Sequence, residues 1–529
     1  MTKETVSFKE TQAFSKLMLD YIAQEEALKS FYGQYPTREN FLKQAELKSQ
    51  SYQNRTVLYE CLVKQYEGFK IHQNVSKNLH ALKEENTFTI TTGHQLNLFT
   101  GPLYFIYKIV CVINLAEEMN RFSSDKKFVP VYWMATEDHD FEEINHFNYK
   151  EKVIRWNSDQ TGAVGRFDLK GMNEVFKTLE IILPNSKKKT YLLSLFRETY
   201  LETNSLAYAT RILVNELFEE YGLIIIDGDD PKLKTLFKPY VQEELVQQTA
   251  FNKVSKSIDD LRALGYKIQV NPREINLFYL FKGGRERIIF EDNEFIINNT
   301  SLRFSKEELL TELDQNPQNF SPNVLLRPLY QEVILPNVAY IGGGGEIAYW
   351  LELKSFFNSQ KIPFPILKLR NSVLVLGKSV REKIIKKNLT LQDIFSSPAL
   401  LFEDLVRKNT EIDLSFERYF KVFEDEFSQL KTIAKETDKS FLSAVEAHEA
   451  KVSKSIRILE KRLLKAEKRK FEEQKESIEN LYFKIHPKGK IQERVVNFSE
   501  IIIDTDITFI KEVKTHLNPF EDEFVILTF

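Results

Sequence analysis

The sequence predicts an α/β fold with a largely parallel sheet, followed by a long α-helical coiled coil. Two observations predict this fold class. From about residue 87 to 370, strand-like and helix-like runs alternate, which is typical of a parallel sheet with crossover helices. From 404 to 482 the chain contains no proline and no glycine, and lysine and glutamate dominate. That composition favours long, uninterrupted helices.

Four short apolar runs are the predicted strands of the α/β part. The first, Phe88 to Thr92, is followed by Pro102, which can open a helix whose apolar residues recur at helical spacing. The other three runs are Phe128 to Met134, Leu223 to Ile226 and Val338 to Ile341. Open α/β sheets bind ligands beyond the carboxyl ends of their strands, so the residues after these runs are the first candidates for a site.

The carboxy-terminal helical segment carries a heptad pattern. Its apolar residues recur at alternating steps of three and four, and Glu449 fills the one gap. They are Leu442, Val445, Val452, Ile456, Leu459, Leu463 and Ala466. This spacing favours a coiled coil over a plain amphipathic helix. A turn between Thr437 and Ser440 would fold the segment into an antiparallel hairpin of two long helices.

At 529 residues, the chain is long enough for two to four domains. We assign residues 1–86 to a helical amino-terminal extension and 87–400 to the α/β core. An inserted subdomain of short antiparallel strands is expected around 250–320. Residues 401–483 form the coiled coil, and 484–529 form a tail that packs back on the core.

Composition excludes several classes of protein. Lysine and arginine total 73 against 76 acidic residues, so a net charge of −3 gives no nucleic-acid footprint. The only two cysteines, Cys61 and Cys111, lie in apolar helical patterns, which predicts buried thiols rather than disulfides or a zinc cluster. We expect no signal peptide, because the amino-terminal residues are polar and mixed in charge, and no membrane span, because no run of 18 apolar residues occurs. We therefore expect a cytoplasmic protein.

Polar, titratable residues follow the first two predicted strands. Gly93, His94 and Gln95 end the first, and Glu137-Asp138-His139-Asp140 follows the second. Clustered carboxylates repel one another, and this cost is best tolerated where a cation or an ammonium group binds. Mg²⁺, a substrate amine and proton transfer by His139 all fit the cluster. Glu142 and Glu143, in contrast, are typical of a helix start.

A glycine run, Gly342 to Gly345, follows the last predicted strand and precedes a helix. Glycines expose backbone amides to an anionic ligand, although a tight turn would explain them equally well. Arg327 and Arg370 lie in otherwise apolar stretches. Such arginines pair either with a substrate oxyanion or with a carboxylate of the protein.

Four motifs, in this order, carry a resemblance to a known family. GHQLNLFTGPLYFIYK, PVYWMATEDHDFEEIN, SPNVLLRPLYQEVILPNVAYIGGGGEIAYW and HPKGKIQERV are similar to the bacillithiol-biosynthesis cysteine-adding enzyme family, BshC. The resemblance implies a Rossmann-like core akin to nucleotidyltransferases, connecting subdomains, and a coiled coil that forms a homodimer. It implies a ligase that joins cysteine to glucosaminyl-malate through an amide bond.

The chemistry of that reaction suggests roles for the candidate residues. A free carboxylate must be activated, most simply by ATP, with Mg²⁺ as a further candidate. His94 and the glycine run suit phosphate or oxyanion contact, and Gln95 beside His94 is a further catalytic candidate. Glu137, Asp138 and Asp140 suit an ammonium group or Mg²⁺, and Arg327 and Arg370 suit malyl carboxylates. The full set of expected binding residues is Gly93, Tyr104, Lys108, Trp133, Arg327, Tyr340, Gly342, Gly343, Gly344, Glu346 and Arg370.

Two other functions are compatible with the same sequence. The first is a nucleotidyltransferase of another pathway that uses the same cleft. The second is a non-catalytic coiled-coil scaffold whose core binds a nucleotide. The density of titratable residues at the strand ends argues against the scaffold.

Overall fold

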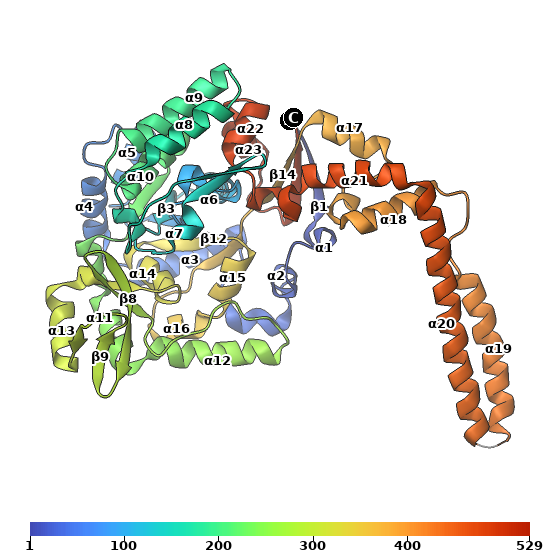
Figure 1. Cartoon of the computed structure of the whole chain (residues 1–529). Coiled ribbons are helices and arrows are strands. Elements are labelled where there is room, and N and C mark those ends of the chain that lie inside the picture. Colours follow the sequence, from blue (N-terminus) through green and yellow to red (C-terminus); the bar gives the residue numbers. More distant parts are fainter. Residues whose placement is uncertain (438) are drawn as a thin grey trace. The chain divides into compact units, whose positions relative to one another are not determined.

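The computed structural model describes residues 1–437 and 439–529, which form two compact units (Figure 1). The core unit comprises residues 1–375, 490–527 and Phe529, and the helical unit comprises 376–489 and Thr528. The sequence places the corresponding boundaries near 400 and 484. The helical unit of the structure is longer than the expected coiled-coil segment at both ends. This is because α18 (Pro398–Asn409) packs against α21 (Glu472–Ile485), and the His486 ring bonds the carbonyl oxygen of Ile394 at 2.7 Å.

The core unit is built on a five-stranded, fully parallel sheet with the strand order β13-β12-β2-β3-β6. Its strands are β2 (Thr87–His94), β3 (Lys127–Met134), β6 (Ile224–Asp227), β12 (Asn337–Gly342) and β13 (Ile366–Leu369). All four predicted runs form strands of this sheet. The chain winds outward from β2 to β6 and then returns to β12 on the other side of β2. The strand order therefore reverses between β2 and β12, where such sheets bind ligands.

Two helices supply most of one apolar layer on this sheet. They are α3 (Arg38–Ser51) and α6 (Tyr104–Phe122), the helix expected after Pro102. Phe41 of α3 and Leu115 of α6 are fully buried with Ile90 of β2 and Ile341 of β12 in one cluster. Burying a side chain of this size contributes about 1.5–3 kcal/mol, so this layer fixes the sheet that positions the strand ends.

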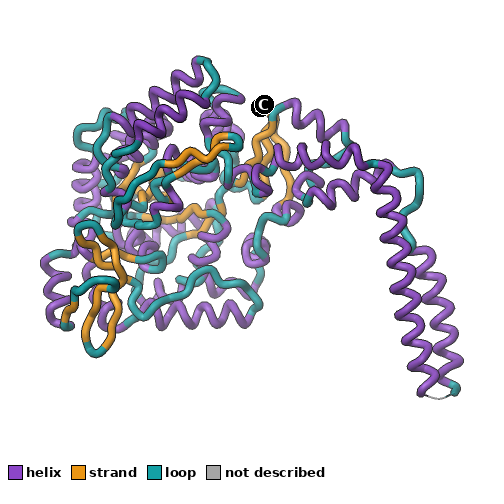
Figure 2. The backbone as a smooth tube through the Cα atoms, in the orientation of Figure 1, coloured by secondary structure: helices purple, strands orange, loops and turns teal. Residues whose placement is uncertain are grey.

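The subdomain after β6 is antiparallel, with the strand order β10-β9-β8-β7-β11 (Figure 2). Its strands are β7 (Leu277–Phe281), β8 (Gly284–Glu291), β9 (Glu294–Ile297), β10 (Arg303–Phe304) and β11 (Phe320–Pro322). The first part of the expected subdomain, from residue 250, is instead helix α12 (Thr249–Ala263). A hairpin of β4 (His146–Tyr149) and β5 (Lys152–Arg155) lies between β3 and β6 in the sequence.

The amino-terminal region was predicted to be helical, but it begins with a strand. β1 (Thr2–Ser7) pairs with β15 (Glu523–Thr528), which also pairs with β14 (Ser372–Leu376). The partner of β1 lies at the far end of the chain, so no local pattern could identify it. The helices that follow β1 are α1 (Phe8–Thr11), α2 (Lys16–Ile22), α3, α4 (Arg55–Gln65) and α5 (Gln73–Ala81).

The remaining helices of the core unit connect and cover the strands. They are α7 (Phe141–Ile144), α8 (Met172–Ile182), α9 (Lys187–Phe196), α10 (Leu206–Phe218), α11 (Pro231–Gln247), α13 (Lys306–Gln315), α14 (Leu326–Ile334), α15 (Gly344–Leu351), α16 (Lys354–Ser359), α22 (Phe498–Asp504) and α23 (Phe509–His516). Both cysteines are free and buried, as expected. Among the described residues, no helix is both long and apolar enough to cross a membrane.

The helical unit contains the coiled coil. After α17 (Lys378–Lys386) and α18, helix α19 (Glu417–Lys435) runs antiparallel to α20 (Lys439–Lys470) (Figure 1). The Phe416 amide donates to Glu460 at 3.0 Å, and Lys431 pairs with Glu449 at 2.5 Å. The two contacts fix an antiparallel hairpin. The turn expected between Thr437 and Ser440 includes Asp438, which lies outside the described residues.

A buried polar network joins α3 to the sheet beside the switch point. The Lys48 ammonium lies 3.4 Å from the Glu332 carboxylate, and both side chains are almost fully buried. Glu332 also accepts from Asn337 Nδ2 at 2.6 Å. Asn337 Oδ1 in turn accepts from the hydroxyls of Thr89 and Thr91, at 3.1 and 2.8 Å. The network thereby ties β12 to β2 and to the amino-terminal region.

Glu332→Gln should destabilise the protein by about 3 kcal/mol, because it leaves the buried Lys48 ammonium without a counter-charge. Lys48→Met combined with Glu332→Gln should recover most of that loss, since it removes both charges and keeps an oxygen for Asn337. Thermal and urea unfolding would measure both variants, with the exposed Glu84→Gln as the control. A double variant less stable than Glu332→Gln would contradict this account.

Candidate functional site

A cavity of about 870 Å³ opens at the carboxyl ends of β2, β3 and β12. Most of the expected site residues line it, although they come from distant parts of the sequence. They are Gly93, His94, Gln95, Tyr104, Trp133, Glu137, Asp138, His139, Asp140, Arg327, Tyr340, Gly343, Glu346 and Arg370. Of the expected residues, Lys108, Gly342 and Gly344 do not line this cavity. Its volume lies within the range of pockets that enclose small-molecule ligands.

His94, the last residue of β2, presents a neutral imidazole to the cavity. Burial, reinforced by the positive charges of Lys108 and Arg370, lowers the pKa of His94 to about 3. The ring packs between Tyr104 and Phe105, with centroids 5.3 and 5.2 Å away. Its buried Nε2 atom has no hydrogen-bond partner among the described residues. A neutral ring with an unused nitrogen is suited to a hydrogen bond with a ligand.

An ion pair between Lys108 and Glu346, of which Glu346 lines the cavity, joins the two sides of the switch point. Lys108 Nζ donates to the carbonyl oxygen of Gly93 at 2.6 Å and contacts the Glu346 carboxylate at 2.9 Å. Burial alone would raise the pKa of Glu346, but the Lys108 ammonium and hydrogen bonds from Gly343 and Tyr340 lower it to about 2. Glu346 is therefore ionised and already engaged by the protein.

The glycine run forms the end of β12 and the start of α15. Gly343 is the N-cap, and its amide donates to Glu346 Oε2 at 2.9 Å. The amides of Gly344 and Gly345 occupy the next two positions, which have no partner within the helix. At Gly342, an added Cβ atom would come within 3.1 Å of Glu346 and Ile347, so a larger residue there would have to displace these side chains.

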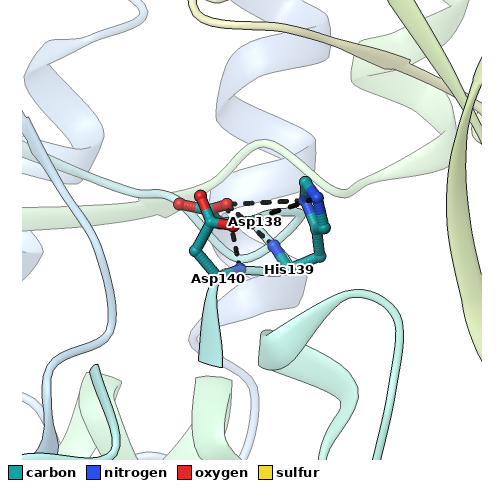
Figure 3. A group of neighbouring side chains, drawn as sticks. All are labelled: Asp138, His139 and Asp140. Atoms are coloured by element: carbon teal, nitrogen blue, oxygen red, sulfur yellow. Dashed lines mark hydrogen bonds and ion pairs between the residues drawn. The ribbon is translucent and has the colours of Figure 1, made fainter. Parts of the chain in front are cut away.

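Three consecutive residues that follow β3, namely Asp138, His139 and Asp140, bring their side chains together (Figure 3). Asp138 Oδ1 accepts from the His139 amide at 2.7 Å, and Asp138 Oδ2 accepts from Gln95 Nε2 at 2.7 Å. Gln95 Nε2 also donates to Glu143 at 3.0 Å. Gln95 therefore orients the acidic cluster and is not itself free to react.

The His139 ring is held by an arginine that sequence reasoning missed. Arg285 Nη1 lies 2.8 Å from His139 Nδ1. A guanidinium can only donate hydrogen bonds, so Nδ1 must accept, and the neutral ring then carries its proton on Nε2. Arg285 is fixed in turn by the Ser321 hydroxyl and the Pro322 carbonyl oxygen, at 3.1 and 3.0 Å. In this arrangement His139 acts as a hydrogen-bond donor toward the cavity.

The acidic cluster of Asp138, His139 and Asp140 offers few free ligand atoms to a metal ion. One ligand atom from each of Asp138, His139 and Asp140 lies within 4.8 Å of the others. However, His139 Nδ1 and the Asp138 oxygens already accept hydrogen bonds, and the Arg285 guanidinium opposes a second cation nearby. Mg²⁺ prefers six oxygen ligands and commonly binds one or two carboxylates together with substrate phosphates. Asp138 and Asp140 could supply such carboxylates.

Glu137 and Arg370 line the cavity, but the protein itself engages their charges. Glu137 pairs with Lys234 at 2.6 Å. Arg370 pairs with Glu493 at 2.7 Å, and the two side chains are only 4% and 3% exposed, respectively. Of the two partners expected for Arg370, a substrate oxyanion or a carboxylate of the protein, the structure therefore shows the second. Glu142 lies in the first turn of α7, as expected for a helix-start charge. Its carboxylate pairs with the exposed Arg155.

Arg327 differs because no ion pair joins it to a carboxylate in the part of the chain that the structure describes. Its guanidinium donates to Gln331 Oε1 at 3.1 Å and to the Tyr349 hydroxyl at 3.3 Å. A Cβ atom on Gly93 would lie 3.3 Å from Arg327 Nη1, so glycine at the end of β2 gives this guanidinium room. Arg327 thus presents an unneutralised positive charge to the cavity.

Three further arginines line the cavity and were absent from the sequence-based set: Arg273, Arg287 and Arg494. None forms an ion pair with a described carboxylate. Arg285 and Arg287 share one face of β8 because they are two residues apart in a strand, which the alternation in RERI could have indicated. Only the tertiary structure shows that this face meets the ends of β2 and β3.

Because its pKa is about 3, the His94 ring should stay neutral between pH 8 and 5, whereas histidine in a peptide titrates near pH 6.5. NMR of histidine-labelled protein would check this, since the chain has only eight histidines and His94→Gln would assign the signal. A ring signal of His94 that titrates with a midpoint near 6 would contradict the buried, neutral assignment.

Comparisons with known proteins agree with this architecture. The model for the amino-terminal Rossmann-like domain of bacillithiol biosynthesis BshC matches residues 1–371, and the model for its carboxy-terminal coiled-coil domain matches 373–529. These matches confirm the predicted fold class. Proteins named "Putative cysteine ligase BshC" include those of Flavobacterium johnsoniae, 46% identical with both chains fully covered, and Flavobacterium psychrophilum, 47% identical over 100% of this chain and 99% of its own. That of Bacillus cereus AH187 is 30% identical over 83% and 84%. The chain therefore belongs to the BshC family of bacillithiol biosynthesis.

Proposed function

We propose that this protein is an ATP-dependent ligase that joins L-cysteine to glucosaminyl-malate through an amide bond. Family membership supports a ligase of bacillithiol biosynthesis, because the relatives carry the name cysteine ligase. The observation that carries the finer proposal is the composition of the large cavity. It combines the neutral His94, the unneutralised Arg327 and the fixed carboxylate of Asp138 within one enclosure.

The proposed reaction has two steps. The cysteine carboxylate attacks the α-phosphorus of ATP, pyrophosphate leaves, and a cysteinyl adenylate forms. The amino group of glucosaminyl-malate then attacks the acyl carbon, AMP leaves with the electrons of the carbon–oxygen bond, and the nitrogen loses a proton. Holding three reactants in one cavity removes much of the entropic barrier to these encounters.

We assign anion contacts to His94, Arg327 and the start of α15. His94 can donate a hydrogen bond from a ring N–H to a phosphate oxygen without a change of charge, because its ring is neutral. The amide of Gly345, which lines the cavity, lies at the positive end of the α15 helix dipole. Arg327 provides two-pronged recognition of a carboxylate, which suits the malyl group.

We assign the ammonium group of cysteine to the carboxylates of Asp138 and Asp140, since both line the cavity. The sequence suggested that His139 transfers the proton. With its Nδ1 lone pair engaged by Arg285, His139 instead offers an Nε2–H group that can polarise a carbonyl or phosphate oxygen. Asp140, whose side chain is 55% exposed, is then the more accessible proton acceptor for the attacking amine.

Purified protein supplied with cysteine, glucosaminyl-malate and ATP should form bacillithiol, measured by mass spectrometry. Release of AMP and pyrophosphate would support an adenylate, while ADP and phosphate would indicate an acyl phosphate. Transfer of the nucleotide to another acceptor would favour the nucleotidyltransferase alternative. In a deletion strain, His94→Ala and Asp138→Asn should each leave glucosaminyl-malate accumulated. Full restoration of bacillithiol by both variants would overturn the assigned roles.

Arg327→Gln should lower kcat/KM for glucosaminyl-malate by about ten- to a hundredfold, as expected for the loss of a charge-assisted hydrogen bond. Methyl glucosaminide lacks the malyl carboxylates, so the same substitution should change its kcat/KM little. Arg155→Gln, at an exposed ion pair outside the cavity lining, is the matched control. Equal losses for both acceptors would show that Arg327 does not recognise the malyl group.

A further inference from the structure

A second, smaller cavity of about 160 Å³ adjoins the glycine run. It shares Gly343, Gly345, Arg370 and Arg494 with the large cavity. Its other walls come from residues around the start of α2, from Gln269 and from the β14–β15 sheet. The volume is several times the ~30 Å³ of a water molecule, and it is below the ~300 Å³ of the smallest pockets for drug-sized ligands. Only a small group fits.

Arg370 brings an unused donor to this cavity. Its Nη1 and Nη2 atoms bond Glu493 at 3.0 and 2.7 Å, but its buried Nε has no hydrogen-bond partner among the described residues. The side chain is only 4% exposed. Nε lies 3.8 Å from the position that a Cβ atom on Gly343 would occupy, which places it beside the glycine run. A buried cationic donor without an acceptor is costly, so this atom favours an oxygen in the cavity.

The glycine run contributes backbone donors to the same place. Gly344 and Gly345 are the first two residues of α15, and their amides have no partner within the helix. Neither conformation nor packing requires glycine at 343 or 345. Gly343 has a φ of −76°, and Cβ atoms added at the two positions would meet nothing closer than 3.5 and 3.9 Å. Without side chains, however, the amides remain open to a ligand.

The charge of the cavity is positive. Arg370 and Glu493 neutralise each other, and Arg494 forms no ion pair with a described carboxylate. The end of α15 adds the positive pole of its dipole. An arginine side chain, an Nε–H donor and helix amides around a small space form the combination that binds tetrahedral oxyanions in proteins.

We propose that this small cavity binds a phosphate group. Its occupant is either a phosphate of a nucleotide that reaches past the glycine run from the large cavity, or free phosphate or pyrophosphate. The nucleotide alternative rests on the proposed ATP dependence, whereas the binding of free phosphate or pyrophosphate does not, because it can be measured without turnover.

Isothermal titration of the full-length protein with inorganic phosphate and with pyrophosphate tests this site. Arg494→Gln removes the unpaired charge, and Ala13→Leu fills the cavity from a residue that does not line the larger one. Each should weaken binding by about tenfold or more, the effect of one charge-assisted contact. Arg155→Gln, at an exposed ion pair outside both cavities, should leave the affinity unchanged.

Gly345→Ala separates a loss of phosphate binding from a loss of folding. Alanine is the better helix former, so this variant should keep or raise the melting temperature while it weakens phosphate binding. Competition identifies the source of the phosphate: displacement by ATP indicates a nucleotide phosphate, and simultaneous binding of ATP indicates free phosphate. No binding by the unaltered protein, or binding lost in Arg327→Gln but kept in Ala13→Leu, would overturn the proposal.

Discussion

The Lys108–Glu346 ion pair is the interaction on which the site depends most. Open α/β sheets leave a crevice where the strand order reverses, and here that crevice lies between β2 and β12. Lys108 bonds the end of β2 through the Gly93 carbonyl oxygen and Glu346 at the start of α15. Lys108 is almost fully buried whereas Glu346 is 29% exposed, so the buried ammonium depends on this carboxylate for its counter-charge. The pair thereby fixes the spacing between His94 and the glycine run.

Two other buried ion pairs connect this crevice to distant parts of the chain. Lys48 and Glu332 lie behind Gln331, which holds the Arg327 guanidinium toward the cavity. Arg370 engages Glu493 of the carboxy-terminal region, which returns to the core after the coiled coil. Because Lys48 and Arg370 have counter-ions within the protein, their charges stabilise the fold. The arginines without counter-ions remain to attract anionic ligands, which explains why one cavity contains both kinds.

Local sequence patterns were sufficient for four strands of the parallel sheet and for the long helices, but not for β1 or α12. The four β-branched runs form strands, the helix after Pro102 forms, and the heptad pattern becomes one arm of an antiparallel hairpin. These outcomes follow because strand and helix periodicity report which face of each element is buried. The strand-end rule then placed His94 and Asp138 at one edge of the sheet, and the cavity contains both.

By itself, the sequence determined the parallel sheet, the coiled coil and the residue types at the strand ends, because short-range spacing encodes them. Only the tertiary structure decided which charges are free. The pairing of Arg370 with Glu493, the fixing of His139 by Arg285 and the pairing of β1 with β15 join residues more than 100 positions apart. No spacing rule reaches that far, since such contacts arise from the packing of the complete sheet rather than from any single element.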